Sequence, residues 1–351
     1  MNSLLPRQQV LEGSYTAHPP ALPGFPVVTE RTRAAKYKRY HKLIAVLSAF
    51  LAAALLVIVV FHGFLAWMIA NPYVAPLSSN PKDAIGLNYE DVLFPSASGR
   101  SMVSGWFIPA EDNTRTAASS KTIIFSHGYG ANREESWVPM YELTKLLHSL
   151  HYNVLMFDYG YASQEYKSPA TGGYEESQQL LAAVHNMKAR GSEHIIVWGF
   201  SMGAGTALQT GLLTDDIDAM LLDSLFLPSS EALFDNLNQF IALPKFPSHA
   251  LIQAILPLWT GTSFQNIPAS TVMNNSYPIP LYVMHGTNDA KADYTTAEAI
   301  AASQHNPLSR SWIVQGGQHE MLFRMHAREY ISRAALFLGQ VEQMLEEESS
   351  T

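Results

Sequence analysis

The sequence predicts an α/β fold with a doubly wound, mostly parallel sheet, preceded by an N-terminal transmembrane helix. Short apolar runs alternate with helical patterns from residue 86 onward, which is typical of parallel sheets covered by helices. A long uncharged apolar stretch lies close to the N-terminus. The 351 residues, nearly half of them hydrophobic, suffice for one large α/β domain and an appendage.

The apolar stretch is long enough to cross a bilayer. Residues 43–61 carry no charge, and Ser48 is the one polar side chain among them. At 1.5 Å per residue they span roughly 28 Å, about one hydrocarbon core. A buried core helix would show a polar face, and a signal peptide has a shorter apolar region followed by a small-x-small cleavage site. We therefore predict an uncleaved signal-anchor helix over 43–70.

The flanks of this helix predict its orientation. Lys82 is nearly alone on the C-terminal side, whereas six basic residues precede the helix. Basic flanks stay in the cytoplasm, so we expect a single-pass protein of the cell membrane with an extracytoplasmic C-terminal part. Residues 1–42, rich in prolines and polar side chains at their start, are expected to form a disordered basic cytoplasmic tail. Residues 71–85, with three prolines, are expected to form a linker. The six basic residues are Arg31, Arg33, Lys36, Lys38, Arg39 and Lys42.

Composition excludes several functions. The net charge is −8 with both signs mixed through the main body, and neither a basic stripe nor a zinc-finger spacing occurs, so we predict no nucleic-acid partner. The absence of cysteine excludes disulfides, a thiolate nucleophile and cysteine-ligated metals. His148 and His151 lie on one helix face without a third ligand nearby, so we predict no metal and no cofactor. Nothing in the sequence indicates a protein partner.

Residues 86–348 read as the folded domain. It opens with two alternating segments that predict an antiparallel pair, 87–95 and 101–108, around a turn. The further predicted strands are 122–126, 153–157, 195–200, 219–225, 280–284 and 311–314. The predicted helices are 137–151, 174–189, 201–213, 294–303 and 321–347. In such sheets the functional site lies at the carboxyl ends of the strands.

The third of these parallel strands runs directly into Gly-x-Ser-x-Gly. Such a strand–turn–helix context is that of a nucleophile elbow, in which a strained backbone exposes the Oγ of Ser201. Gly199 and Gly203 are expected there because a Cβ would collide with the neighbouring strand and helix.

Other strand ends supply partners for this serine. Asp289 and His319 follow two later strands, so the chain order is serine, aspartate, histidine. A histidine can take the serine proton, and a carboxylate fixes its tautomer. Asp223, at the end of another strand, is a rival for the acid. The backbone amides of Tyr129 and Met202 are the expected oxyanion hole.

These motifs resemble the α/β-hydrolase superfamily, and more closely the single-pass bacterial hydrolases of the serine aminopeptidase-like group. The resemblance covers about 86–345 and rests on Gly105–Ala110, Ser126–Glu134, the serine elbow, the His285–Asp289 segment and His319. It implies a serine hydrolase with the three residues above as its triad. Such hydrolases usually carry an Asp-x-Arg-Gly-x-Gly-x-Ser segment, whereas residues 157–163 are one residue shorter here and lack the arginine.

The expected activity is cleavage of carboxylic esters, thioesters or acyl lipids through an acyl-enzyme. Residues 227–277 lie where this fold inserts its lid, and their apolar periodicity predicts helices broken by prolines. They could pack over the sheet, or form an acyl-chain wall or a membrane-facing lid. The partners are then a small acyl-ester or lipid-like substrate and the lipid bilayer. Alternatives are an amidase or aminopeptidase, with Glu134 and Glu176 as amine-binding candidates, and a non-catalytic binding protein.

Overall fold

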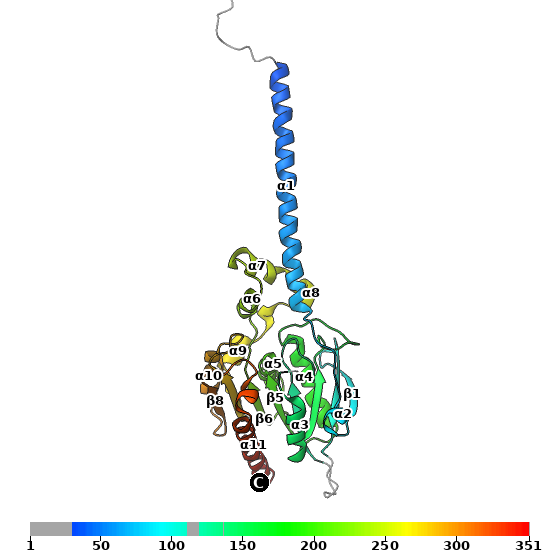
Figure 1. The fold of residues 1–351 in the computed structure, drawn as a ribbon, viewed down its shortest axis with the longest axis vertical. Helices are drawn as coiled ribbons and strands as arrows, with labels where there is room; N and C mark the ends of the chain where they lie inside the picture. Colours follow the sequence, from blue (N-terminus) through cyan, green and yellow to red (C-terminus); the bar gives the residue numbers. More distant parts are fainter. Residues whose placement is uncertain (1–29, 111–118, 136, 351) are drawn as a thin grey trace, which may run out of the picture. The chain divides into compact units, whose positions relative to one another are not determined.

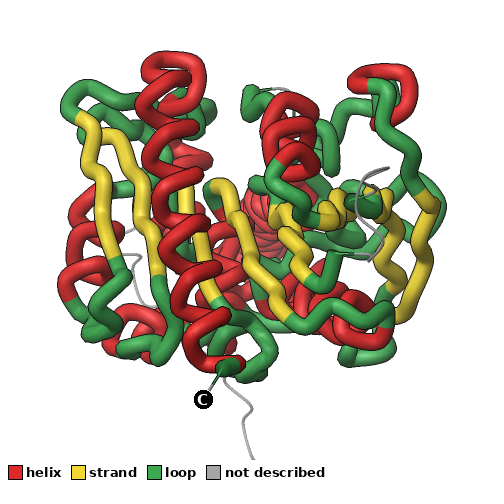
Figure 2. Tube along the Cα trace, turned by 90° about the horizontal axis from the view of Figure 1, so that it is seen from below, coloured by secondary structure: helices red, strands yellow, loops and turns green. Residues whose placement is uncertain are grey.

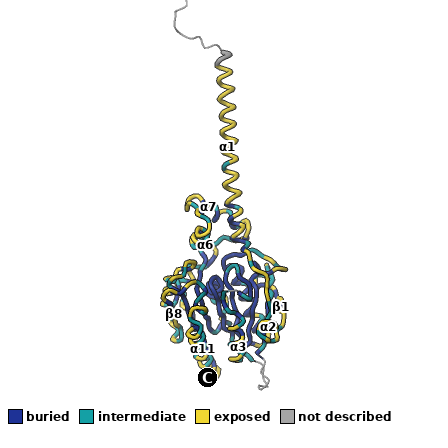
Figure 3. Tube along the Cα trace, in the orientation of Figure 1, coloured by how far each residue is buried: buried dark blue, intermediate teal, exposed yellow. Residues whose placement is uncertain are grey.

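A computed structural model describes residues 30–110, 119–135 and 137–350 (Figure 1). It begins with α1 (Glu30–Ala70), whose 18-residue apolar window has a mean hydropathy of 3.1 and contains no buried residue, so α1 is long and apolar enough to cross a membrane. Figure 3 shows most of this helix as exposed. Residues 30–42 were expected to be disordered, and this part of the prediction was wrong: no glycine or proline interrupts the chain from 30 to 62. Residues 1–29 of the predicted tail lie outside the described residues.

The chain divides into two compact units, Met1–Val57 and Ile58–Thr351. The second unit therefore includes the last turns of α1 as well as the folded domain expected from residue 86. The segment 71–85, expected to be a linker, contains the short helix α2 (Pro81–Ile85), capped by the side chain of Asn80.

An eight-stranded sheet organises the second unit, and it confirms the predicted fold class. The strand order is β1-β2-β4-β3-β5-β6-β7-β8, and only the pairings β1–β2 and β2–β4 are antiparallel. The strands are β1 (Glu90–Pro95), β2 (Met102–Ile108), β3 (Lys121–Ser126), β4 (Asn153–Asp158), β5 (His194–Phe200), β6 (Ala219–Asp223), β7 (Leu281–Gly286) and β8 (Arg310–Val314).

Helices cover both faces of this sheet, as Figure 2 shows. One apolar cluster joins the sheet to α4, α5 and α10, and a second cluster joins its other face to α3 and α11. Parallel strands buried on both faces need continuous apolar runs, and β4, β6 and β7 are buried throughout. The helices are α3 (Met140–Ser149), α4 (Tyr174–Ala189), α5 (Met202–Thr210), α10 (Tyr294–Ala302) and α11 (Leu322–Ser349).

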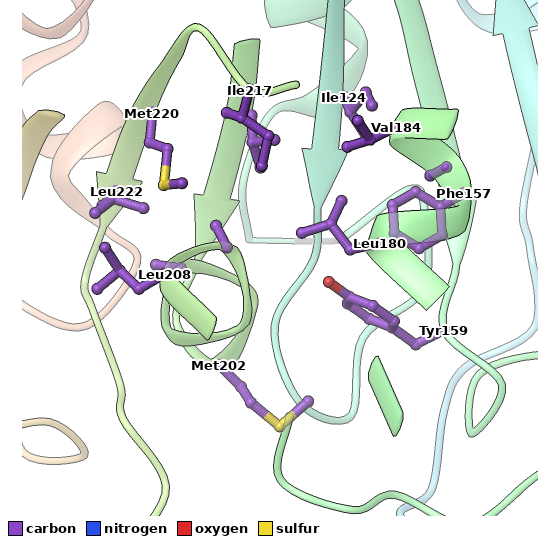
Figure 4. Packing of buried hydrophobic residues seen from close by; sticks show 14 of the residues in the cluster. Ile124, Phe157, Tyr159, Leu180, Val184, Met202, Leu208, Ile217, Met220 and Leu222 are labelled. Carbon is purple, nitrogen blue, oxygen red and sulfur yellow. The ribbon is translucent and has the colours of Figure 1, made fainter. Parts of the chain in front are cut away.

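The first cluster reaches the start of α5 (Figure 4). Leu180 and Val184 of α4 lie beside Phe157 and Tyr159, and Met202 projects from the beginning of α5 near them. The same packing that closes the core thus fixes the residue that follows Ser201.

The predicted lid segment, for which two amphipathic helices broken by Pro244 and Pro247 were expected, folds into several short helices because prolines interrupt it repeatedly. Phe234 of α6 packs with Leu65 and Ile69 of α1 in a third apolar cluster. The elements are α6 (Ser230–Asn238), α7 (Lys245–Ile255), α8 (Pro257–Thr260), η1 (Phe264–Asn266) and α9 (Ala269–Asn274).

Candidate active site

Ser201 occupies a strained turn between β5 and α5. Its φ of 51° and ψ of −120° are unfavourable for a residue with a Cβ, and such strain is characteristic of functional turns. A Cβ on Gly203 would lie 2.0 Å from the Ser126 carbonyl oxygen, and one on Gly199 would lie 2.6 Å from Ala204 Cα. The chain can pass this close to β3 and α5 only because both positions are glycine.

The structure brings the three predicted catalytic side chains together. His319 Nε2 lies 2.8 Å from Ser201 Oγ, and His319 Nδ1 lies 2.6 Å from Asp289 Oδ2. The three residues follow β5, β7 and β8, so their convergence results from the parallel strands ending at one edge of the sheet. With Nδ1–H donated to the carboxylate, Nε2 is free to accept the serine proton.

The Asp289 carboxylate is held in one orientation. Its Oδ1 accepts hydrogen bonds from the backbone amides of Lys291 (2.8 Å) and Ala292 (2.9 Å), so Oδ2 faces His319. The buried imidazole of His285 also lies 3.2 Å from Oδ2. Burial alone would raise the pKa of this carboxyl, but the hydrogen bonds from His285 and His319 outweigh it and hold the pKa below the usual aspartate range. Asp289 therefore stays ionised at neutral pH.

The rival acid, Asp223, is engaged elsewhere. Tyr330 donates its hydroxyl to Oδ2 at 2.7 Å, and Ser224 Oγ lies 2.9 Å from Oδ1. Burial raises the pKa of the Asp223 carboxyl, although these two hydrogen bonds oppose the shift. Asp223 is thus bonded to Tyr330 and Ser224, whereas Asp289 contacts His319.

The loop after β3 carries Tyr129, whose amide was expected in the oxyanion hole. The loop is braced by His127, which accepts a hydrogen bond from Tyr159 N–H at Nε2 (3.0 Å). Tyr161 donates its hydroxyl to the Gly128 carbonyl at 2.9 Å. Burial lowers the pKa of His127 to about 4, so this imidazole is neutral and can accept that bond. His127 therefore has a structural role in this loop.

A pair of buried carboxyls beneath this loop was missed by sequence reasoning. Oε1 of Glu135 and Oε1 of Glu320 lie 3.0 and 2.7 Å from the place a Cβ would take on Gly128. Glu135 Oε2 accepts the Gly128 amide at 3.3 Å, while both Oε1 atoms are buried without a hydrogen-bond donor among the described residues. Two carboxylates cannot satisfy each other, but a proton held between them satisfies both. Burial, and then the repulsion of Glu320, raise the pKa of Glu135 well above its usual value.

This pair predicts a pH-dependent stability. In the unfolded chain Glu135 has the ordinary glutamate pKa of 4.5 and loses its proton above that pH. In the folded protein its pKa is raised, so it keeps the proton there. Stability therefore falls as pH rises from about 4.5 towards the folded pKa, and each pKa unit of the shift costs about 1.4 kcal/mol. Glu135→Gln should flatten this fall, because the amide donates to Glu320 without titrating. Thermal midpoints of both proteins between pH 5 and 8 measure the effect.

In Glu135→Gln the decrease of stability with rising pH should be smaller but still present, since burial also raises the pKa of Asp223 and Glu176. Equal slopes for the wild type and Glu135→Gln would show that the pair holds no shared proton.

A cavity of about 310 Å³ leads to Ser201 and His319. Its walls are mainly apolar and come from α1, the loop after β3 and the lid segment. This volume falls within the usual range for small-molecule sites. Glu320 contributes one carboxyl to the lining, and its side chain lies 3.8 Å from His319 Nε2.

The carboxylates considered for an amine subsite have other partners. Glu134 accepts the backbone amides of Ser78 and Ser79 at 2.5 and 2.7 Å. Glu176 caps the start of α4, where it accepts from the amides of Thr171 and Gly173. Neither residue lines the cavity at Ser201.

Asp158, in the segment 157–163 that lacks the arginine, pairs with an arginine from another part of the chain. Arg133 donates its guanidinium to Asp158 Oδ2 at 2.8 Å, and its backbone amide donates to Oδ1 at 2.7 Å. Both side chains are buried, so this ion pair fixes the loop after β3 to the end of β4. Within the described ranges, no group of three or more histidine, aspartate or glutamate side chains could hold a metal ion.

Comparisons with known proteins agree with this architecture. Residues 121–249 match the family model described as the alpha/beta hydrolase fold. The chain is 23% identical over 258 residues to the uncharacterized protein YfhR of Salmonella typhimurium, covering 69% of this chain and 78% of that protein.

Among solved structures, the esterase Pf2001 of Pyrococcus furiosus is similar with a TM-score of 0.60 and 26% identity, covering 77% of this chain and 99% of the other. Brefeldin A esterase, a bacterial homologue of human hormone sensitive lipase, has the same fold with a TM-score of 0.54 at 14% identity, covering 82% and 86%. Both of these solved structures are described as esterases. The sheet, the family model and these neighbours together show that the chain has the α/β-hydrolase fold.

Proposed function

We propose that this protein is a membrane-anchored serine hydrolase that cleaves carboxylic esters through an acyl-enzyme. The observation that carries the proposal is the continuous hydrogen-bonded line from Ser201 Oγ through His319 to Asp289, with separations of 2.8 and 2.6 Å. A nucleophile, its base and the group that orients the base are all within direct reach, which is the arrangement that activates a serine hydroxyl.

The reaction follows from the geometry. Ser201 Oγ attacks the ester carbonyl carbon while its proton moves to His319 Nε2. The oxyanion that forms is stabilised by the amides of Met202 and Tyr129. The intermediate collapses with cleavage of the C–O bond, and His319 returns its proton to the leaving alcohol. Water then attacks the acyl-enzyme by the same route and releases the acid.

The substrate class follows from the cavity. Apolar walls favour an acyl group, and a cavity of about 310 Å³ holds on the order of ten groups the size of a water molecule, each about 30 Å³. Cleavage of an amide remains the second candidate. An amine would need an acidic subsite; Glu134 and Glu176 are bound elsewhere, and Glu320 is the carboxyl that lines this cavity.

The proposed location rests on α1. Residues 43–61 would span the bilayer, and the basic residues before them would keep the N-terminus in the cytoplasm. The catalytic unit would then face the extracytoplasmic side.

The test uses the full chain in detergent with p-nitrophenyl esters from acetyl to palmitoyl and the p-nitroanilide of the preferred acyl group. We expect ester hydrolysis to peak between about four and ten carbons, because the cavity holds about ten such groups. The anilide should react at least 100-fold more slowly. An anilide cleaved as fast as the ester would favour the amidase, and a folded protein that hydrolyses neither would favour a binding protein.

A further inference from the structure

The last turns of α1 have two apolar faces. One face is buried within the catalytic unit, and its residues recur every three or four positions as on one side of a helix. The opposite face is exposed, yet it carries Phe64, Trp67 and Met68 in place of polar side chains. A helix resting on a water-soluble domain normally presents polar residues outward, so this exposed face is not suited to water. The buried residues are His62, Leu65, Ala66, Ile69 and Ala70.

The lid helices pack against the buried face and expose apolar side chains of their own. Phe234 and Leu256 share a buried cluster with Leu65. Trp259 of α8 donates its indole N–H to the carbonyl of Gly63 at 3.1 Å. The lid helices therefore contact the C-terminal end of α1, the helix that would cross the bilayer.

The exposed apolar residues of this region form what we call the lid surface. Phe240, Phe246 and Leu258 are 81%, 84% and 81% exposed, values far from those of core residues. Residues 236–288 contain no aspartate or glutamate and one lysine, although the whole chain has a net charge of −8. Glu231 and Asp235 of α6 precede this stretch, and Glu231 is paired with Lys245. No acidic residue therefore lies between Phe240 and Leu258 to oppose contact with lipid headgroups. It comprises Phe64, Trp67, Phe240, Phe246, Leu258 and Trp259.

The cavity at Ser201 opens beside the lid surface. Met68 and Phe240 line the cavity and are themselves exposed, so the apolar lining continues to the outside at these residues. Tyr129 donates its hydroxyl to the carbonyl of Ile69 at 2.7 Å, which links the oxyanion loop to the same turn of α1. The C-terminal end of α1 thus lines the cavity and also holds the loop after β3 through the Tyr129 hydrogen bond.

We propose that the lid surface lies in the interfacial layer of the bilayer, and that the cavity takes its acyl ester directly from the lipid phase. The substrate part of this proposal rests on the proposed function. We assign a lipid surface rather than another protein as the partner of the lid surface, because the helix that carries Phe64 and Trp67 also carries the apolar stretch 43–61. Trp67 follows that stretch by six residues, about 9 Å along the helix. Amphipathic surfaces bury their apolar side chains roughly 5–10 Å into the headgroup boundary.

The depth of the lid surface can be measured independently of activity. Because the chain contains no cysteine, Phe246→Cys and Leu258→Cys each provide one site for a nitroxide label. Leu336→Cys, on the exposed side of α11, is the matched control. In phosphatidylcholine nanodiscs we expect the ratio of oxygen to nickel-chelate collisions to be at least threefold higher at 246 and 258 than at 336. Equal ratios at all three sites would overturn the proposal.

The source of the substrate needs a second measurement. Full-length protein in nanodiscs is given either a fluorogenic acyl glycerol embedded in the bilayer or soluble p-nitrophenyl butyrate. Phe246→Ser combined with Leu258→Ser should lower the rate on the embedded ester at least fivefold and the rate on butyrate less than twofold, whereas Leu336→Ser changes neither. Equal losses on both esters, or a wild type that cleaves butyrate alone, would refute uptake from the lipid phase.

These outcomes separate the two proposals. A wild type that cleaves neither ester would overturn the proposed function, and with it the uptake of lipid esters. The label depths would still decide in that case whether the lid surface lies in the bilayer.

Discussion

Ser201→Ala should abolish measurable ester hydrolysis, with a loss in kcat on the order of 10⁴- to 10⁶-fold, because the acyl-enzyme cannot form without Oγ. The loss should be accompanied by loss of labelling with a fluorophosphonate probe. The substitution keeps the Cβ at the strained φ of 51°, so the thermal midpoint should change little. The measurements are kcat for the preferred p-nitrophenyl ester, probe labelling and the thermal midpoint.

Ser224→Ala is the matched control for this variant. Ser224 is also buried with a φ of 51°, but it follows β6, and its Oγ accepts the amide of Glu320 at 2.8 Å instead of facing His319. We expect less than a tenfold loss of kcat. If Ser201→Ala retained more than about one per cent of the activity while folded, Ser201 would not be the nucleophile.

The strands and the order of the strand-end residues could be predicted from the sequence because both are local signals. The β5 strand and its glycine-flanked Ser201 are contiguous in sequence, and the strand ends before Asp289 and His319 are marked by apolar runs. A parallel sheet then places these ends on one edge without further information. The sequence therefore predicted which residues would meet, and the structure shows how far apart they lie.

Features that depend on contacts between distant segments could not be predicted in this way. Glu135 and Glu320 are 185 positions apart, and their pairing depends on how two loops meet at Gly128. The packing of Ile58–Ala70 could not be predicted from the sequence either. Both faces of this segment are apolar, so hydrophobic periodicity does not show which face contacts lipid and which contacts the lid helices. The apolar pattern of residues 227–277 predicted helices, but only the fold shows that α6 packs against α1.

Asp289→Asn should lower kcat/KM by about 10³- to 10⁴-fold without removing any catalytic group. The amides of Lys291 and Ala292 both donate to Oδ1, so the asparagine must place its carbonyl oxygen there. Its NH₂ group then takes the place of Oδ2 and donates to His319 Nδ1. This forces the imidazole proton onto Nε2, where it faces Ser201 Oγ and blocks proton transfer.

Asp223→Asn is the paired control for the choice of acid. Asp223 bonds to Tyr330 and Ser224, and burial already raises its pKa, so a neutral amide should cost less than tenfold in kcat/KM. Both variants should keep the wild-type thermal midpoint within a few degrees. If Asp223→Asn were the more damaging substitution, the acid would be the last residue of β6, and the 2.6 Å contact between His319 and Asp289 would be structural. If Asp289→Asn alone is inactive, the tautomer of His319 is what this carboxylate controls.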